Sequence, residues 1–169
     1  KTTADHVAII SGNPSGENVL VRMHSECITG EAFGSLKCEC GPQLDFALDQ
    51  IANDPNGGIV IYLRGQEGRG IGLLNKLRAY SLQDQGYDTV DANLALGLPS
   101  ENREYGAAVA ILRDMGVSSV RLMTNNPAKS GFLNSAGIPV NEYVAVLVGQ
   151  ALENAGYMET KRARMGHII

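Results

Sequence analysis

The run IVIYL at residues 59–63 constrains the fold of this chain more than any other sequence feature. It is continuous in apolar residues rather than alternating, which is typical of a strand buried on both faces of a sheet. Such a sheet needs helices against both faces. Stretches with the apolar period of helices do alternate with strand-like stretches along the chain. We therefore predict one α/β domain with a mixed β-sheet flanked by helices.

The other expected elements are short apolar stretches between turn residues, and segments with helical periodicity. The predicted strands, besides the central one, are those at residues 6–10, 19–23, 120–123 and 144–148. Proline is tolerated in the first turn of a helix, where its missing N–H is harmless. The predicted helices begin at Pro42 and at Pro127, run from the glycine-rich loop 65–72 to about Gln85, end at Gly116, and cover the tail beyond Gln150.

Charge and hydropathy exclude several classes of function. The formal net charge is −4 and the pI is about 5.3, whereas a protein that neutralises a nucleic-acid backbone is usually basic. We therefore expect no nucleic-acid partner. No apolar run approaches the roughly 18 residues of a membrane helix, and the sequence shows no secretory leader, so we expect no membrane partner and a cytoplasmic location. The chain starts abruptly at residues 1–5, and we expect an upstream segment to be missing.

Three cysteines, Cys27, Cys38 and Cys40, lie within fourteen positions. An odd number in one short stretch is a poor disulfide framework, and clustered cysteines in a reducing compartment more often bind metal. Thiolates are soft ligands that suit zinc. Structural zinc sites usually have four protein ligands, whereas catalytic sites keep one position for water. Three cysteines without a fourth therefore indicate a catalytic zinc site.

Other interpretations of these cysteines fit parts of the pattern. Free cysteine is among the most buried residue types, so the three thiols can belong to an ordinary core. His24 can be the fourth ligand of a closed structural site. The sequence HSE at residues 24–26 fits half of the nucleoside deaminase signature, but the required P-C-x-x-C half is absent, which excludes that class. The first two interpretations stay open.

Two segments that contain the cysteines, RMHSECITG at 22–30 and SLKCECG at 35–41, resemble the zinc segment of GTP cyclohydrolase II. The resemblance implies that Cys27, Cys38 and Cys40 bind one zinc ion, whose water attacks C8 of the guanine. Zinc lowers the pKa of bound water to about 7, which supplies hydroxide at neutral pH. The resemblance also implies GTP contacts from Arg22, His24, Ser25, Glu26 and Gln43. For Glu26, a solvated surface carboxylate is the simpler alternative.

The glycine-rich stretch RGQEGRGIGL at residues 64–73 follows the central strand. Backbone N–H groups of such a loop can approach phosphate, and its arginines can grip phosphate oxygens in two places. By itself the loop is neither a Walker A motif nor a dinucleotide fingerprint. The resemblance continues through it and through residues 74–89. It implies GTP binding by Glu67, Gly68, Arg69 and Thr89, and a catalytic Tyr80 that assists the steps after ring attack.

The family's Asp-x-Arg pattern is matched here by Glu101 and Arg103. The resemblance implies that Arg103 acts on the α-phosphate and that Glu101 accepts a proton. Arginine stays protonated in proteins, so we expect Arg103 to stabilise phosphoryl charge while water attacks. Glu101 departs from the family's aspartate by one methylene, which displaces the carboxylate, and an exposed charge at a helix N-terminus is its alternative role. In residues 122–129 the resemblance implies GTP contacts from Thr124 and Lys129.

The tail segments TK at 160–161 and MGH at 165–167 match as well, so the resemblance covers nearly all of residues 1–169 as one catalytic domain. It implies that GTP and water give 2,5-diamino-6-(ribosylamino)pyrimidin-4-one 5′-phosphate, formate and pyrophosphate. The resemblance also implies that zinc opens the ring, that Mg²⁺ binds with the triphosphate, and that the enzyme is a homodimer. Two alternatives stay open. One is a relative that retains the formyl group or serves a secondary-metabolite pathway, and the other is a zinc-stabilised guanine-nucleotide-binding module without turnover.

Overall fold

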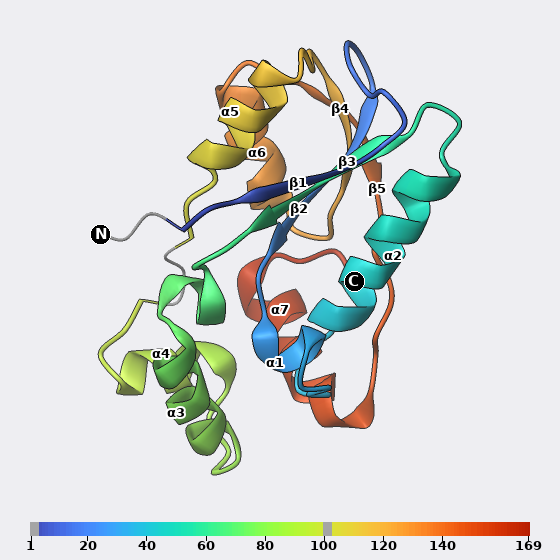
Figure 1. Ribbon diagram of the computed structural model, residues 1–169. Helices are drawn as coiled ribbons and strands as arrows, with labels where there is room; N and C mark the ends of the chain where they lie inside the picture. Colours follow the sequence, from blue (N-terminus) through green and yellow to red (C-terminus); the bar gives the residue numbers. More distant parts are fainter. Residues whose placement is uncertain (1–3, 100–102) are drawn as a thin grey trace.

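A computed structural model describes residues 4–99 and 103–169 (Figure 1). In this part of the chain, five strands form one sheet in the order β1-β3-β2-β4-β5. The strands are β1 (Val7–Ser11), β2 (Val19–Ser25), β3 (Gly58–Leu63), β4 (Val120–Met123) and β5 (Val140–Val144). β1 is antiparallel to β3, and the other neighbouring pairs are parallel. The predicted mixed sheet is confirmed.

Helices cover both faces of this sheet (Figure 1). They are α1 (Ile28–Glu31), α2 (Cys40–Asn53), α3 (Leu73–Gln83), α4 (Thr89–Ala95), α5 (Gly106–Asp114), α6 (Pro127–Ser135) and α7 (Ala155–Met165), with 3₁₀ turns η1 (Glu67–Gly70) and η2 (Leu152–Asn154). α5 and α6 pack on one face of the sheet, and α2 packs on the other. Within the described residues, none of the helices combines the length and the apolar character needed to cross a bilayer.

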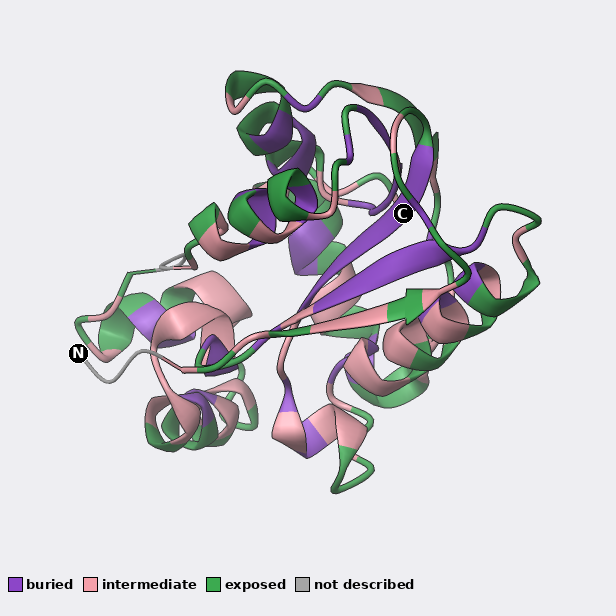
Figure 2. Ribbon diagram, turned by 45° about the horizontal axis from the view of Figure 1, so that its top comes forward, coloured by how far each residue is buried: buried purple, intermediate pink, exposed green. Residues whose placement is uncertain are grey.

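The position of β3 between two layers of helices explains why its sequence is apolar without alternation. Ile59, Ile61 and Leu63 belong to the core under α5 and α6. Val60 points to the opposite face and packs with Ala47 and Ile51 of α2. Successive side chains of a strand face opposite sides, so a strand between two helical layers must be apolar at every position. Figure 2 shows β3 and its neighbour β2 as largely buried, whereas β1 on the other side of β3 is partly exposed.

The last strand lies four residues before its predicted position. β5 pairs with β4 from Val140 to Val144, whereas residues 144–148 were the predicted strand, so that prediction is wrong beyond Val144. The apolar residues that suggested it are buried for another reason. Asn125 bonds both backbone groups of Val146, through its Oδ1 to the N–H (2.8 Å) and its Nδ2 to the carbonyl (2.7 Å). The side-chain amide takes the place of a neighbouring strand.

Two short helices have no counterpart in the sequence analysis. α4 begins at an Asp88 cap, which accepts a hydrogen bond from Asp91 N–H (2.8 Å). Its seven residues, TVDANLA, carry no extended apolar stripe, so periodicity does not reveal it. α1 is a single turn of four residues. The helix predicted to open at Pro42 begins at Cys40, which places one of the three cysteines in its first turn.

Candidate active site

A cavity lies at the edge of the sheet where the parallel strands β2, β3 and β4 end. Ligands of open α/β sheets bind at this position, outside the carboxyl ends of the strands. Every residue that the sequence predicted to bind metal or GTP, or to act in catalysis, lines the cavity except Glu67 and Glu101. Glu67 is buried beside it and pairs with Lys76, which does line it. Glu101 lies outside the described residues.

The three cysteine sulfurs converge at one end of the cavity. Their Sγ atoms all lie within 4.8 Å of one another, and Cys27 Sγ is 3.6 Å from Cys38 Sγ. Sulfurs about 2.3 Å from a tetrahedral zinc ion would be roughly 3.8 Å apart. Gly30 leaves room for them, because a Cβ at that position would lie 2.8 Å from Cys38 Sγ. The donor type and the spacing both fit zinc.

The contacts of His24 differ from those expected of a fourth metal ligand. Its Nε2 lies 2.6 Å from Glu31 Oε1, and its ring stacks on Tyr62 at a centroid separation of 5.7 Å. Among the described residues, the group that could hold a metal consists of the three cysteines. The geometry therefore favours an open three-thiolate site over a closed structural one. Burial lowers the pKa of His24, despite its contact with Glu31.

Lys76 of α3 contacts one of the sulfurs directly, and the sequence analysis did not single it out. Its Nζ donates to Cys27 Sγ (3.0 Å) and to the Glu67 carboxylate. Hydrogen bonds from Cys38 and Cys40, with the charge of Lys76, lower the pKa of the Cys27 thiol. Burial alone would lower the pKa of Lys76, but its contacts with Cys27 and Glu67 raise it overall. Lys76 is therefore a fixed positive charge that favours thiolate.

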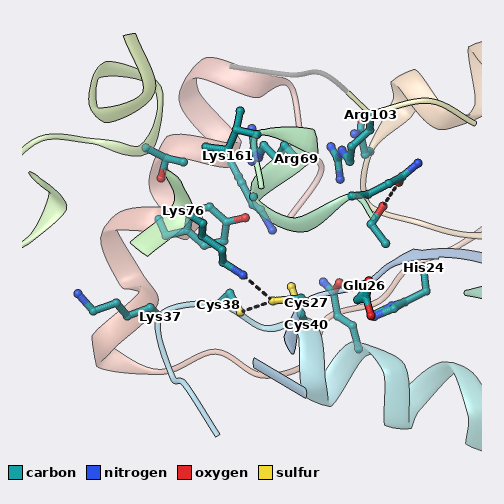
Figure 3. Close-up of a pocket in the computed structure, with 18 of the residues that line it drawn as sticks. His24, Glu26, Cys27, Lys37, Cys38, Cys40, Arg69, Lys76, Arg103 and Lys161 are labelled. Atoms are coloured by element: carbon teal, nitrogen blue, oxygen red, sulfur yellow. Dashed lines mark hydrogen bonds between the residues drawn. The ribbon is translucent and has the colours of Figure 1, made fainter. Parts of the chain in front are cut away.

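The glycine-rich loop carries Arg69 in an uncommon backbone conformation. Arg69 has a φ of 63° and Gly68 a φ of 58°, a left-handed region that costs a residue with a Cβ about 1 kcal/mol or more. At Gly68 a Cβ would also lie 2.8 Å from Ile71 Cγ1. Strain of this kind persists where the surroundings impose it, most often at ligand sites. Here the loop directs the guanidinium of Arg69 to the cavity (Figure 3).

Gln66 connects three segments of the cavity wall. It accepts a hydrogen bond from Ser25 Oγ at the end of β2 (2.8 Å) and donates from Nε2 to the backbone carbonyl of Glu104. This chain of contacts ties the segment that carries Arg103 to the sheet. Arg103 Cζ lies 6.0 Å from the ring centroid of Tyr105. The sequence analysis did not single out Gln66, because its contacts are with residues distant in sequence.

Two buried cations form the wall next to β4. Arg22 donates to the carbonyl of Met123 (3.0 Å) and to Gln43 Oε1 (2.8 Å). Burial lowers the pKa of Arg22 to about 10, so it remains protonated at neutral pH. Lys129 Nζ donates to the carbonyl of Met23 (2.7 Å). Both side chains are buried, so this wall of the cavity carries positive charge.

The sequence profile of the GTP cyclohydrolase II family matches residues 1–145. The chain belongs to this family. Riboflavin biosynthesis protein RibBA of Salinispora tropica is 55% identical over 99% of this chain and 42% of its own length. The protein of the same name from Salinispora arenicola is 56% identical, over 99% and 40%, and that from Rhodococcus jostii 55%, over 96% and 40%. The chain thus spans about two fifths of these relatives.

Membership of the GTP cyclohydrolase II family confirms the resemblance found in the sequence and identifies the chain as an enzyme of the hydrolase class. The segment beyond residue 145 lies outside the family match, yet it also contributes to the cavity. Tyr157, Lys161 and His167 line it. Lys161 is buried and pairs with Glu39, which stands between two cysteines in the sequence.

Tyr80, for which the sequence resemblance implied a catalytic role, lies near the cysteines. It lines the cavity from α3, with its hydroxyl 3.4 Å from Thr29 Oγ1. Thr29 Oγ1 is in turn 3.7 Å from Cys27 Sγ. Burial raises the pKa of Tyr80 to about 12, so the phenol is neutral at physiological pH and can donate a proton near the sulfurs.

Proposed function

We propose that residues 1–169 form one catalytic unit that hydrolyses GTP to 2,5-diamino-6-(ribosylamino)pyrimidin-4-one 5′-phosphate, formate and pyrophosphate. The observation that carries the proposal is the division of one cavity into two chemically different ends. Three thiols converge at one end, and Arg69 and Arg103 lie away from them on the other side of the cavity (Figure 3). The thiol end suits a metal that acts on the guanine base, and the cationic end suits the negatively charged triphosphate, so GTP would use both ends at once. The RibBA relatives are riboflavin biosynthesis proteins, and we propose the same pathway for this chain.

We propose zinc as the metal of the thiol end, held by Cys27, Cys38 and Cys40. A zinc ion there supplies a Lewis acid that lets water act as a nucleophile at neutral pH. Glu26 precedes Cys27 and lines the cavity, and its Oε2 accepts a hydrogen bond from Gly65 N–H (3.0 Å), which holds the carboxylate in place. Glu26 is thereby able to orient water or accept its proton. Tyr80 supplies a proton to the departing groups when the ring opens.

The cationic end binds and activates the triphosphate in this proposal. Arg69 and Lys129 hold phosphate oxygens, and Mg²⁺ accompanies the triphosphate. Arg103 neutralises the charge that develops on the α-phosphoryl group as pyrophosphate leaves, because guanidinium forks match phosphate geometry. Glu101 remains the proposed proton acceptor of this step. The remaining predicted contacts, from Arg22, His24, Ser25, Gln43, Glu67, Gly68, Thr89 and Thr124, are proposed to shape the site around the nucleotide.

One incubation tests the proposal. The protein is supplied with GTP, Zn²⁺ and Mg²⁺, and formate and pyrophosphate are measured in the same sample. The proposal predicts equal amounts of both. Pyrophosphate without formate would instead show a relative that retains the formyl group, which mass spectrometry detects as one extra carbon monoxide unit in the product. Neither product, with guanine nucleotide still bound, would show a binding module without turnover.

We further propose a homodimer in a reducing compartment, the cytoplasm. Exposed leucines support the dimer, since Leu74, Leu77 and Leu94 on α3 and α4 are 72%, 47% and 58% exposed. A mass of twice the 18.0 kDa chain mass, measured by light scattering, would support the homodimer.

The cysteine thiols support the proposal of a reducing compartment. Cys27 and Cys38 sulfurs only 3.6 Å apart would be prone to oxidation outside a reducing environment.

Replacing Tyr80 with phenylalanine is expected to lower formate release by about 10²-fold, because a positioned proton donor contributes at least that much. The ring and its packing stay, so zinc content and nucleotide affinity should not change. Formate is measured enzymatically, and the product mass shows whether the formyl group accumulates. Tyr87→Phe is the control, since Tyr87 is half exposed on the loop after the same helix. Unchanged formate release in Tyr80→Phe would remove Tyr80 from the mechanism.

Replacing Lys76 with methionine is expected to destabilise the fold by about 3 kcal/mol, because the Glu67 carboxylate then stays buried without its ion pair. Zinc affinity is expected to fall about 10-fold or more, as for other contacts to metal ligands. Denaturant unfolding and competition with a chelator measure the two effects. Arg78→Met removes the same charge from an exposed position of α3 and should change neither. An unchanged zinc affinity in Lys76→Met would contradict the assigned role.

A further inference from the structure

The C-terminal residues after α7 fold back onto the cavity. Gly166 ends α7 in the left-handed conformation (φ 65°), which glycine adopts without strain. Beyond it, His167 N–H donates to the carbonyl of Lys161 (3.1 Å), and Ile168 N–H donates to the carbonyl of Asn125 (3.0 Å). Asn125 follows β4 and lines the cavity. The tail is therefore fixed at two points, and His167 is held at the cavity wall.

The side chain of His167 has an unsatisfied polar atom. Its Nε2 is buried and has no hydrogen-bond partner among the described residues. Arg22 Nε, His24 Nδ1 and Glu39 Oε2 share this property, and the side chains of Arg22 and His24 line the same cavity. Buried polar atoms without partners are rare, because each loses its bonds to water. Their concentration here indicates that a ligand supplies the missing partners.

The surroundings of His167 show what kind of ligand that is. The charges that act on its imidazole are those of Lys161, Arg69, Arg103 and Lys129. Burial, together with these charges, lowers the pKa of His167 to about 3. The ring is therefore neutral at physiological pH, with a proton on one nitrogen. A neutral N–H donor among several cations matches an anion with many oxygen acceptors, such as a chain of phosphates.

We propose that His167 binds the triphosphate of GTP through Nε2, and that residues 165–167 form a wall of the phosphate end of the cavity. The inference rests on the proposed function for the identity of the ligand. It adds a contact from outside residues 1–145, the part that the family profile matches. Contact between the tail and the glycine-rich loop supports it, because Arg69 Nη1 lies 3.1 Å from Met165 Sδ. Tail and loop therefore meet at the phosphate end.

Three substitutions test the role of Nε2. The amide nitrogen of glutamine reaches the position of Nε2, whereas that of asparagine reaches only the position of Nδ1. Binding of α,β-methylene-GTP is measured by calorimetry. We expect the Kd to rise about tenfold in His167→Ala and His167→Asn, as for the loss of one hydrogen bond to a charged group. In His167→Gln we expect a Kd within about twofold of wild type, since the donor is retained.

The control is Ile168→Ala, which removes a side chain that is 75% exposed but keeps the backbone bond to Asn125. Zinc content and melting temperature should match wild type in all four variants. Wild-type affinity in His167→Ala, or equal losses in the alanine, asparagine and glutamine variants, would overturn the inference. Wild-type protein that binds the analogue but releases no formate or pyrophosphate from GTP would overturn the proposed function alone. Wild-type protein that does not bind the analogue would overturn both.

Discussion

Replacing Cys38 with serine is expected to abolish zinc binding and to lower formate release by about 10³-fold or more, because a Lewis acid contributes several kcal/mol to such a step. A serine hydroxyl does not ionise at neutral pH and is a harder ligand than a thiolate. The two remaining thiols, Cys27 and Cys40, would leave an incomplete site. Metal content is measured by mass spectrometry of the purified protein, and formate is measured in the same preparation with Zn²⁺ added.

Leu36→Ser is the matched control for this change. Leu36 is 56% exposed and stands two residues before Cys38 on the same loop. The substitution therefore introduces a serine nearby without changing the sulfurs. It should retain both zinc and activity. The proposal fails if Cys38→Ser protein is free of metal and still releases formate at the wild-type rate. Retained zinc in Cys38→Ser would show that Cys38 is not a ligand.

Replacing Arg103 with alanine is expected to lower pyrophosphate release by about 10³-fold, the usual effect of removing an arginine that stabilises a phosphoryl transition state. Arg103→Lys keeps the positive charge but loses the planar fork, so we expect it to recover only part of the rate. Zinc content should be unchanged, because Arg103 lies across the cavity from the sulfurs (Figure 3). Pyrophosphate is followed by a coupled phosphate assay.

Arg162→Ala is the control for the loss of an arginine. Its side chain on α7 is 61% exposed and pairs with Glu159 on the same helix, an arrangement of small energetic value. A rate within threefold of wild type in Arg103→Ala would contradict a role in phosphoryl chemistry. A loss confined to KM, with kcat unchanged, would show that Arg103 binds the ground state and the transition state equally and does not accelerate the chemical step.

The strands and most of the helices could be predicted because they depend on local patterns. The apolar run at residues 59–63 required two covering layers, and both are present in the core. The predicted strand at 144–148 is wrong because apolar character reports burial and not the partner of the backbone. Val146 is buried against α2, but Asn125 takes its backbone hydrogen bonds. α4 was missed because a short helix held by its cap lacks a periodic stripe.

The sequence by itself determined the mixed α/β architecture, the family and the grouping of three thiols, because these follow from residue types and spacing within short segments. The tertiary structure decided which distant groups complete the site. Lys76 neutralises a cysteine 49 positions away, Gln66 ties the Arg103 segment to β2, and the tail brings His167 to the phosphate end. No local pattern encodes these contacts. They exist because parallel strands end at one edge of the sheet, and the segments that follow them must share the space there.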